Sequence, residues 1–361
     1  MCPPQYSFIY TQNCTPFGHS CNVSLTKFGY ILLYKQIVSI MGAPSAALLK
    51  NFSLRRIWPR AQSAVAPSPV TTRFDRELTA ELDTLQSLGT SGALGFVKFL
   101  DAAITTQKIA LDSLVNISYR DDVDREAVDE YLENNIDILD ACNFFMERVE
   151  NLKKYMDSLR VVARLIDTNA TTRALDHLDS CHEIVKQCKV VKKSLRKMLK
   201  QKLGHESELT EIMCGSKAMA LIGCKFLELG LSFYSKVIRM PLMKQSQPMS
   251  CSWMRLLHEL GKEGGGSDSE KKLQKMGFGS LMMIELQQTV AAAQELKEQV
   301  KGKKERDVIK STSERLKRSN RELGEVLEVI EGRVRDLYKN LIEVRMVLLG
   351  ILSHARSFIS D

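Results

Sequence analysis

The chain is poor in residues that break helices and in residues that favour strands. Only 9 of its 361 residues are proline, and aromatic residues make up 7%. Leucine, lysine, glutamate and alanine recur densely instead, a balance that favours helix. No stretch alternates apolar and polar residues as a half-buried strand would. Since 44% of the side chains are hydrophobic, a sizeable core can form, and we expect an all-α fold.

Acidic residues are absent from the start of the chain, where the first one is Asp75. Seven basic residues precede it: Lys27, Lys35, Lys50, Arg55, Arg56, Arg60 and Arg73. Removing these seven from the 51 basic residues leaves 44, against 43 acidic ones. The net charge of +8 therefore belongs to the N-terminal segment. The nearly neutral remainder argues against a nucleic-acid partner.

Residues 1–73 are predicted to form a disordered leader, because they hold seven of the nine prolines and no acid. The segment from Met41 to Arg60 mixes apolar and arginine positions, which is typical of an organellar transit peptide. The alternative is that Met41 is the true start and residues 1–40 are an upstream extension. We expect a cytoplasmic protein, with membrane association or a plastid location as alternatives.

Beyond residue 74, apolar residues recur every three or four positions, which predicts amphipathic helices. We expect helices over 74–88 and 93–117, a long helix after the turn at 119–122, one from 172 to about 199, and one from 208 that stops before Pro241. The long helix has the most regular seam: Val128, Leu132, Ile136, Leu139, Cys142, Met146, Val149, Leu152, Met156, Leu159 and Val162. Residues 74–240 are thus predicted to form a long antiparallel helical bundle.

Residues 241–279 are predicted to be a flexible linker, because Pro241, Pro248 and the run Gly264–Ser269 interrupt the helical pattern. Residues 280–361 are predicted to form C-terminal helices that pack on the bundle. Their seam of apolar residues has coiled-coil-like spacing: Leu323, Val326, Ile330, Val334, Leu337, Leu341, Val344, Leu348 and Ile351. This final helix docks on the bundle or pairs with a partner.

The sequence offers no constellation for catalysis, a cofactor or a metal. Nine cysteines occur without a CxxC pair, which is typical of a reducing compartment, and we interpret the six that lie beyond the leader as buried small residues. His177, Cys181, His182 and Cys188 come closest to a metal site, but they lie on one predicted helix without a second ligand pair. The stretch 218–231 is apolar but shorter than the roughly 20 residues that a bilayer requires, and Lys225 and Glu228 interrupt it.

One predicted helix is basic as well as amphipathic. Its cations are interleaved with apolar residues, and those proposed to bind a partner or a membrane are Lys189, Lys192, Lys193, Arg196, Lys197 and Lys200. Such a helix can lie on an anionic lipid surface or enter an acidic groove. The alternative is a core helix with a basic outer face. A second basic stretch, from Lys301 to Arg321, is interrupted by acids and is interpreted as a solvated face.

Three segments resemble the plant BYPASS-like family of helical proteins. They are Arg73-Phe74-Asp75, the block from Tyr131-Leu132 to Leu139-Asp140-Ala141-Cys142, and the ending from Leu337 to Leu352. The resemblance implies a plant protein of root and shoot development whose relatives restrain a mobile root-derived signal, and it brings no catalytic residues. A related branch is associated with vesicle tethering.

The sequence thus predicts a non-enzymatic developmental or signalling regulator that acts through helix-mediated contacts with proteins. The alternative is a peripheral membrane or vesicle-trafficking adaptor that uses the basic helix.

Overall fold

The computed structural model describes residues 72–87, 92–187, 207–233, 251–262 and 283–357. The chain divides into two units, Met1–Ala66 and Pro67–Asp361. The first unit lies wholly outside the described residues, and so does the predicted leader apart from Thr72 and Arg73. The fold described below is that of the second unit.

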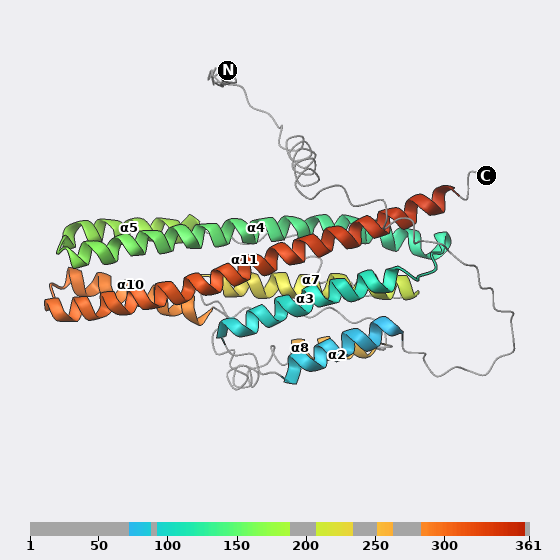
Figure 1. The fold of residues 1–361 in the computed structure, drawn as a ribbon, viewed down its shortest axis with the longest axis horizontal. Helices are drawn as coiled ribbons and strands as arrows, with labels where there is room; N and C mark the ends of the chain where they lie inside the picture. Colours follow the sequence, from blue (N-terminus) through green and yellow to red (C-terminus); the bar gives the residue numbers. More distant parts are fainter. Residues whose placement is uncertain (1–71, 88–91, 188–206, 234–250, 263–282, 358–361) are drawn as a thin grey trace, which may run out of the picture. The chain divides into compact units, whose positions relative to one another are not determined.

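Every element in the described ranges is an α-helix, which confirms the all-α prediction (Figure 1). The helices are α2 (Arg73–Ser87), α3 (Gly92–Leu114), α4 (Asp121–Asp167), α5 (Thr171–Gln187), α7 (Glu208–Gly230), α8 (Ser252–Lys262), α10 (Ile284–Lys301) and α11 (Arg306–Ser357). Among these residues, no helix has both the length and the apolar character needed to cross a membrane.

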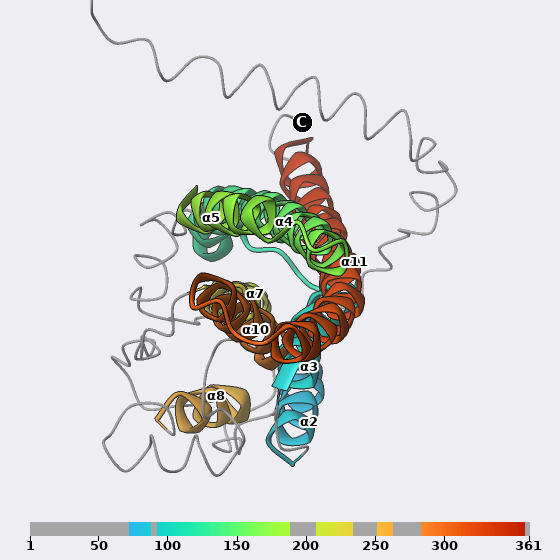
Figure 2. The same cartoon turned by 90° about the vertical axis from the view of Figure 1, so that its left-hand side faces the viewer.

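The two longest helices, α4 and α11, pack against each other in opposite directions (Figures 1 and 2). The Asn135 side-chain amide donates to the Leu341 carbonyl over 3.4 Å, and the Asn320 amide donates to the Met156 carbonyl over 3.0 Å. Residue numbers therefore rise along α4 as they fall along α11. Helix α11 also contacts α3 and α10, and α10 contacts α5. The coiled-coil-like character of α11 stays a prediction.

Most of the predicted seam on α11 is buried against these neighbours, with Val326 and Ile351 only partly covered. The seam on α4 differs most at Ile136, which is 44% exposed while Asn135 is 1% exposed. Met146 of the same seam is only partly buried, beside the fully buried Phe145. The prediction that Ile136 faces the core is wrong. The amide of Asn135 takes the inward position because it bonds to the Leu341 carbonyl of α11.

Helix α7 is buried on nearly all sides and packs against α3 and α4. Phe226 stacks on Phe99 of α3 with ring centroids 3.8 Å apart. The Lys225 ammonium and the Glu228 carboxylate pair within the helix at 2.6 Å, so each buried charge has a partner. The described helix ends at Gly230, well before Pro241. Directly after this end, Arg148 of α4 donates a hydrogen bond to the Leu231 carbonyl over 2.7 Å.

Helix α8 lies within the segment predicted to be a flexible linker, so that prediction is wrong for residues 252–262. Trp253 is fully buried, and α8 packs against α2. The remaining parts of the predicted linker, 241–250 and 263–279, lie outside the described residues. The prolines and glycines that predicted a linker flank α8, and the helix forms because tertiary contacts bury its aromatic residue.

Candidate functional site

The predicted basic site falls in a part of the chain that the structure does not describe. Helix α5 is described to Gln187, whereas Lys189, Lys192, Lys193, Arg196, Lys197 and Lys200 all follow it. The predicted continuation of this helix to about residue 199 lies outside the described residues as well. The use of these cations for a membrane or a partner stays a prediction.

The histidine and cysteine cluster considered for a metal is divided between the core and the surface of α5. Cys181 is 3% exposed, and burial raises the pKa of its thiol to about 11. The thiol is therefore protonated at neutral pH and is a poor ligand or nucleophile. The imidazole of His182 and the whole of Cys188 lie outside the described residues, and His177 is partly buried.

A different group of potential ligands, which the sequence did not indicate, lies where α2, α7 and α8 meet. Asp75, Glu211 and Cys251 are all buried, and each has a ligand atom within 4.8 Å of the others. The three residues come from distant parts of the chain, and only the packing of the helices brings them together. We call this group the α2–α7–α8 junction.

The polar atoms of the junction are already engaged within the protein. One Asp75 oxygen accepts from the backbone amides of Ser252 and Trp253 over 2.9 and 3.2 Å, which caps the N-terminus of α8. Glu211 accepts from the Thr72 hydroxyl over 3.1 Å and from the Cys251 thiol over 3.2 Å. A metal ion would have to replace these donors, so the junction is better explained as a tie between the three helices.

A second buried polar group joins α3, α4 and α7. The Tyr131 hydroxyl lies 2.8 Å from the Ser216 hydroxyl, and Ser216 donates to the Gln107 side-chain carbonyl over 2.6 Å. Burial raises the pKa of Tyr131 to about 12. The contacts described for Ser216 give it no basic partner, so it lacks the general base that a nucleophilic serine requires. This network fixes the register of the three helices.

Both of the long helices α4 and α11 expose large apolar side chains within the described residues. Ile136 of α4 is 44% exposed, and Met346 and Leu349 of α11 are 48% and 39% exposed. Each of the first two directly follows an inward-facing residue, since Asn135 bonds to the Leu341 carbonyl and Arg345 donates to the Leu132 carbonyl.

Because α4 and α11 are antiparallel, one further residue along each helix rotates the side chain toward the same side of the pair. Ile136 and Met346 therefore emerge on a common side. Leu349 lies three positions beyond Met346 and shares its face of α11. We call these three residues the α4–α11 apolar strip. Aliphatic and methionine side chains that gather in this way are typical of protein-contact surfaces.

The comparisons with known proteins address the family. A family model described as Protein BPS1 matches residues 109–351, which covers most of the second unit and includes the α4–α11 apolar strip. No curated protein and no solved structure matches the chain. The matched span contains the segment from Tyr131 to Cys142 and all but the last residue of the segment from Leu337 to Leu352, and a match over this share of the chain shows that it belongs to the BPS1 family of plant developmental proteins.

Proposed function

We propose that the protein is a non-enzymatic regulator of root and shoot development that acts through helix-mediated contacts with other proteins. Family membership supports the developmental role. The α4–α11 apolar strip supports the mode of action, because Ile136, Met346 and Leu349 expose aliphatic or thioether surface within the matched span. The partner presents an apolar face, and its contact removes these side chains from water.

The observation that carries the proposal is the exposure of Ile136. Its spacing along α4 fits the buried seam, yet a polar residue occupies the inward position beside it. An apolar side chain at this position contributes little to the isolated fold. A partner that covers its remaining 44% exposed surface gains roughly 1 kcal/mol, which is under half the value for burying a fully exposed aliphatic side chain.

The test uses a double variant, Met346→Glu with Leu349→Glu, in plants that lack the protein. Charges at two exposed positions leave the fold largely intact, because surface substitutions usually change stability by less than about 0.5 kcal/mol. Circular dichroism and thermal unfolding of the purified variant establish that it folds. We expect the variant to accumulate and yet fail to restore root and shoot development.

Val329→Glu serves as the matched control, since Val329 lies on the same helix and is 47% exposed but is not part of the strip. The control is expected to restore development as the unchanged protein does. Full restoration by the double variant would refute the role of the strip.

The alternative function is a peripheral membrane or vesicle-trafficking adaptor that binds anionic lipid through the basic helix. It rests on the six cations from Lys189 to Lys200 in the sequence. Liposome flotation with a Lys192, Lys193 and Lys197 charge-reversal variant separates the two functions. In cell fractionation, a membrane-bound pool of the protein that salt extracts, and that the charge-reversal variant lacks, supports the adaptor. A cytosolic pool that does not respond to salt supports the regulator.

A further inference from the structure

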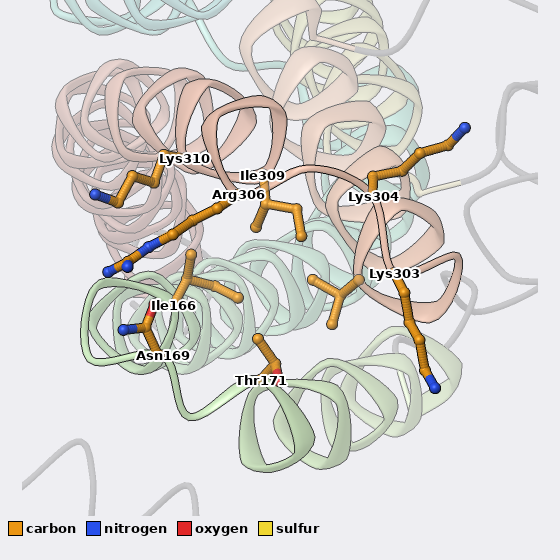
Figure 3. A pocket seen from close by; sticks show the side chains of 9 residues that line it. Ile166, Asn169, Thr171, Lys303, Lys304, Arg306, Ile309 and Lys310 are labelled. Carbon is orange, nitrogen blue, oxygen red and sulfur yellow. The ribbon is translucent and has the colours of Figure 1, made fainter.

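A pocket of about 310 Å³ lies between two helical turns, one joining α4 to α5 and the other joining α10 to α11 (Figure 3). Its floor consists of three buried aliphatic side chains, Ile166, Val300 and Ile309. We call it the turn pocket. A cavity of this size matches the lower end of the range for small-molecule sites, which starts at about 300 Å³.

Four cationic side chains line the turn pocket, namely Lys303, Lys304, Arg306 and Lys310, and no acidic side chain does. In Figure 3, Arg306 and Lys310 extend on one side of the aliphatic floor, whereas Lys303 and Lys304 extend on the other. The acids Glu305 and Asp307 belong to the same segment but do not line the cavity. The lining therefore carries a formal charge of four positive units above an apolar floor.

These cations differ from their neighbours on α11 in how they are paired. Lys317 pairs with Asp167 at 2.8 Å and with Glu314 at 2.7 Å, and Arg315 pairs with Glu295. Within the described ranges, none of the four pocket cations forms an ion pair. Like charges held around one cavity repel one another, so a bound anion would stabilise the arrangement.

The backbone around the pocket also favours an anion. Thr171 is the first residue of α5 and Arg306 is the first residue of α11, and both line the cavity. Amide groups in the first turn of a helix have no acceptor within that helix, and the positive end of the helix dipole lies there. Two helix N-termini thus meet the cationic side chains at one cavity, which is the arrangement that binds phosphate groups.

The two turns share a backbone shape that is unfavourable for one of these lysines. Asn169 and Lys303 adopt left-handed φ values of 58° and 47°. Each turn closes with a bond from the next amide, Ala170 to the Leu165 carbonyl over 2.8 Å and Lys304 to the Gln299 carbonyl over 3.1 Å. Asparagine tolerates this conformation, whereas a long side chain is disfavoured in it. A lysine in the left-handed position is consistent with a role for its charge.

We propose that the turn pocket binds a small ligand that carries several phosphate groups. The cationic side chains and the first-turn amides hold the phosphates, and the carbon skeleton of the ligand lies on the aliphatic floor. A guanidinium and three ammonium groups match a ligand with several phosphates better than a single carboxylate. A soluble inositol polyphosphate and the headgroup of a phosphoinositide lipid share this chemistry. The turn pocket does not include the α4–α11 apolar strip, so this proposal stands apart from the proposed function.

The test measures binding of inositol hexakisphosphate to the full chain by isothermal titration calorimetry, and of vesicles with and without phosphatidylinositol 4,5-bisphosphate by flotation. Arg306→Gln and Lys310→Gln are each expected to weaken binding by about tenfold or more, as the loss of a charged hydrogen bond does. Arg321→Gln removes an exposed charge from the same helix away from the pocket and is expected to leave affinity unchanged.

Lys303→Asn separates binding from folding. Asparagine suits the left-handed backbone, so the melting temperature is expected to stay the same or rise while affinity falls. Misfolding cannot produce that combination.

If inositol hexakisphosphate binds and the pocket variants bind it more weakly, the ligand is a free molecule. If only the phosphoinositide vesicles bind, and the pocket variants again bind more weakly, the ligand is a lipid headgroup. The proposal is overturned if neither probe binds at up to about 1 mM. It is also overturned if binding depends on Lys192, Lys193 and Lys197 and ignores the pocket variants.

Discussion

The α2–α7–α8 junction and the turn pocket are both formed by residues from distant parts of the chain, yet they treat their charged side chains in opposite ways. At the junction, Asp75 and Glu211 are buried and accept hydrogen bonds from Thr72, Cys251 and the first amides of α8. At the turn pocket, the cations are exposed and lie around a cavity with no acidic lining. A buried charge whose hydrogen-bond donors come from the protein itself has a structural role. Charges that line a cavity without an ion-pair partner indicate a bound ligand instead.

The largest effect is expected at the contact between Phe74 and Gly215 beside the junction. Phe74 is fully buried, and a Cβ on Gly215 would lie 2.6 Å from its ring. Phe74→Ala should lower the free energy of unfolding by about 3–5 kcal/mol, and Gly215→Ala by about 1–3 kcal/mol through overpacking.

Urea denaturation of the two single variants and the double variant tests this contact directly. The double variant should lose less stability than the sum of the single losses, because removal of the ring makes room for the new methyl group. Additive losses would mean that Phe74 and Gly215 do not share the space.

A smaller effect is expected from the cap that Asp75 provides to α8. Asp75→Ala removes the acceptor for two amides and should cost about 0.5–2 kcal/mol. Asp75→Asn keeps an oxygen acceptor and should cost less. Limited proteolysis within residues 252–262 measures the release of α8. Equal protection of the alanine variant and the unchanged protein would show that the junction does not hold this helix.

The smallest effect concerns two lysines near the turn pocket. Lys317→Gln loses the ion pairs with Asp167 and Glu314 and should cost up to about 1 kcal/mol, as exposed ion pairs do. Lys310→Gln should leave stability unchanged or raise it slightly, because it relieves repulsion within the pocket. A loss of stability in Lys310→Gln equal to that in Lys317→Gln would remove the distinction between paired and pocket cations.

The pH dependence gives a second measure of the Lys317 pairs. Hydrogen bonding to Asp167 and Glu314 raises the pKa of Lys317 above its ordinary value of 10.5. A raised folded-state pKa means that the stabilisation is complete below the unfolded pKa and is lost as the pH rises through the folded one. Thermal unfolding from pH 8 to about pH 11 should therefore show the difference between Lys317→Gln and the unchanged protein shrinking at the alkaline end.

Helical periodicity predicted most of the described helices, since an apolar residue every third or fourth position is a local property of the chain. Helices α2, α3 and α4 lie close to their predicted ranges, and the seam on α11 is largely buried. The prediction was wrong at Ile136, because periodicity cannot tell which of two adjacent residues meets the neighbouring helix. A buried asparagine that bonds to a backbone carbonyl decided that position.

The sequence did not indicate the junction or the turn pocket, because neither is local. Helix α8 was missed because it is short, stands between proline- and glycine-rich stretches, and is held by Asp75, which lies 177 residues earlier in the chain. Lys303, Lys304 and Arg306 were interpreted as part of a solvated face. Only the packing of α10 and α11 on α5 and α4 adds Asn169, Thr171 and an aliphatic floor to them.

The stacking of Phe99 on Phe226 limits how the protein can be divided for expression. The family match begins at residue 109, inside α3, whereas Phe99 and Ala103 of the same helix cover α7, with Ala103 3.2 Å from a Cβ placed on Gly223. A recombinant fragment cut at the boundary of the match would lose this cover and aggregate through the bared surface of α7. Fragments meant for crystallisation or binding assays should begin at Gly92 or earlier, so that the whole of α3 is kept.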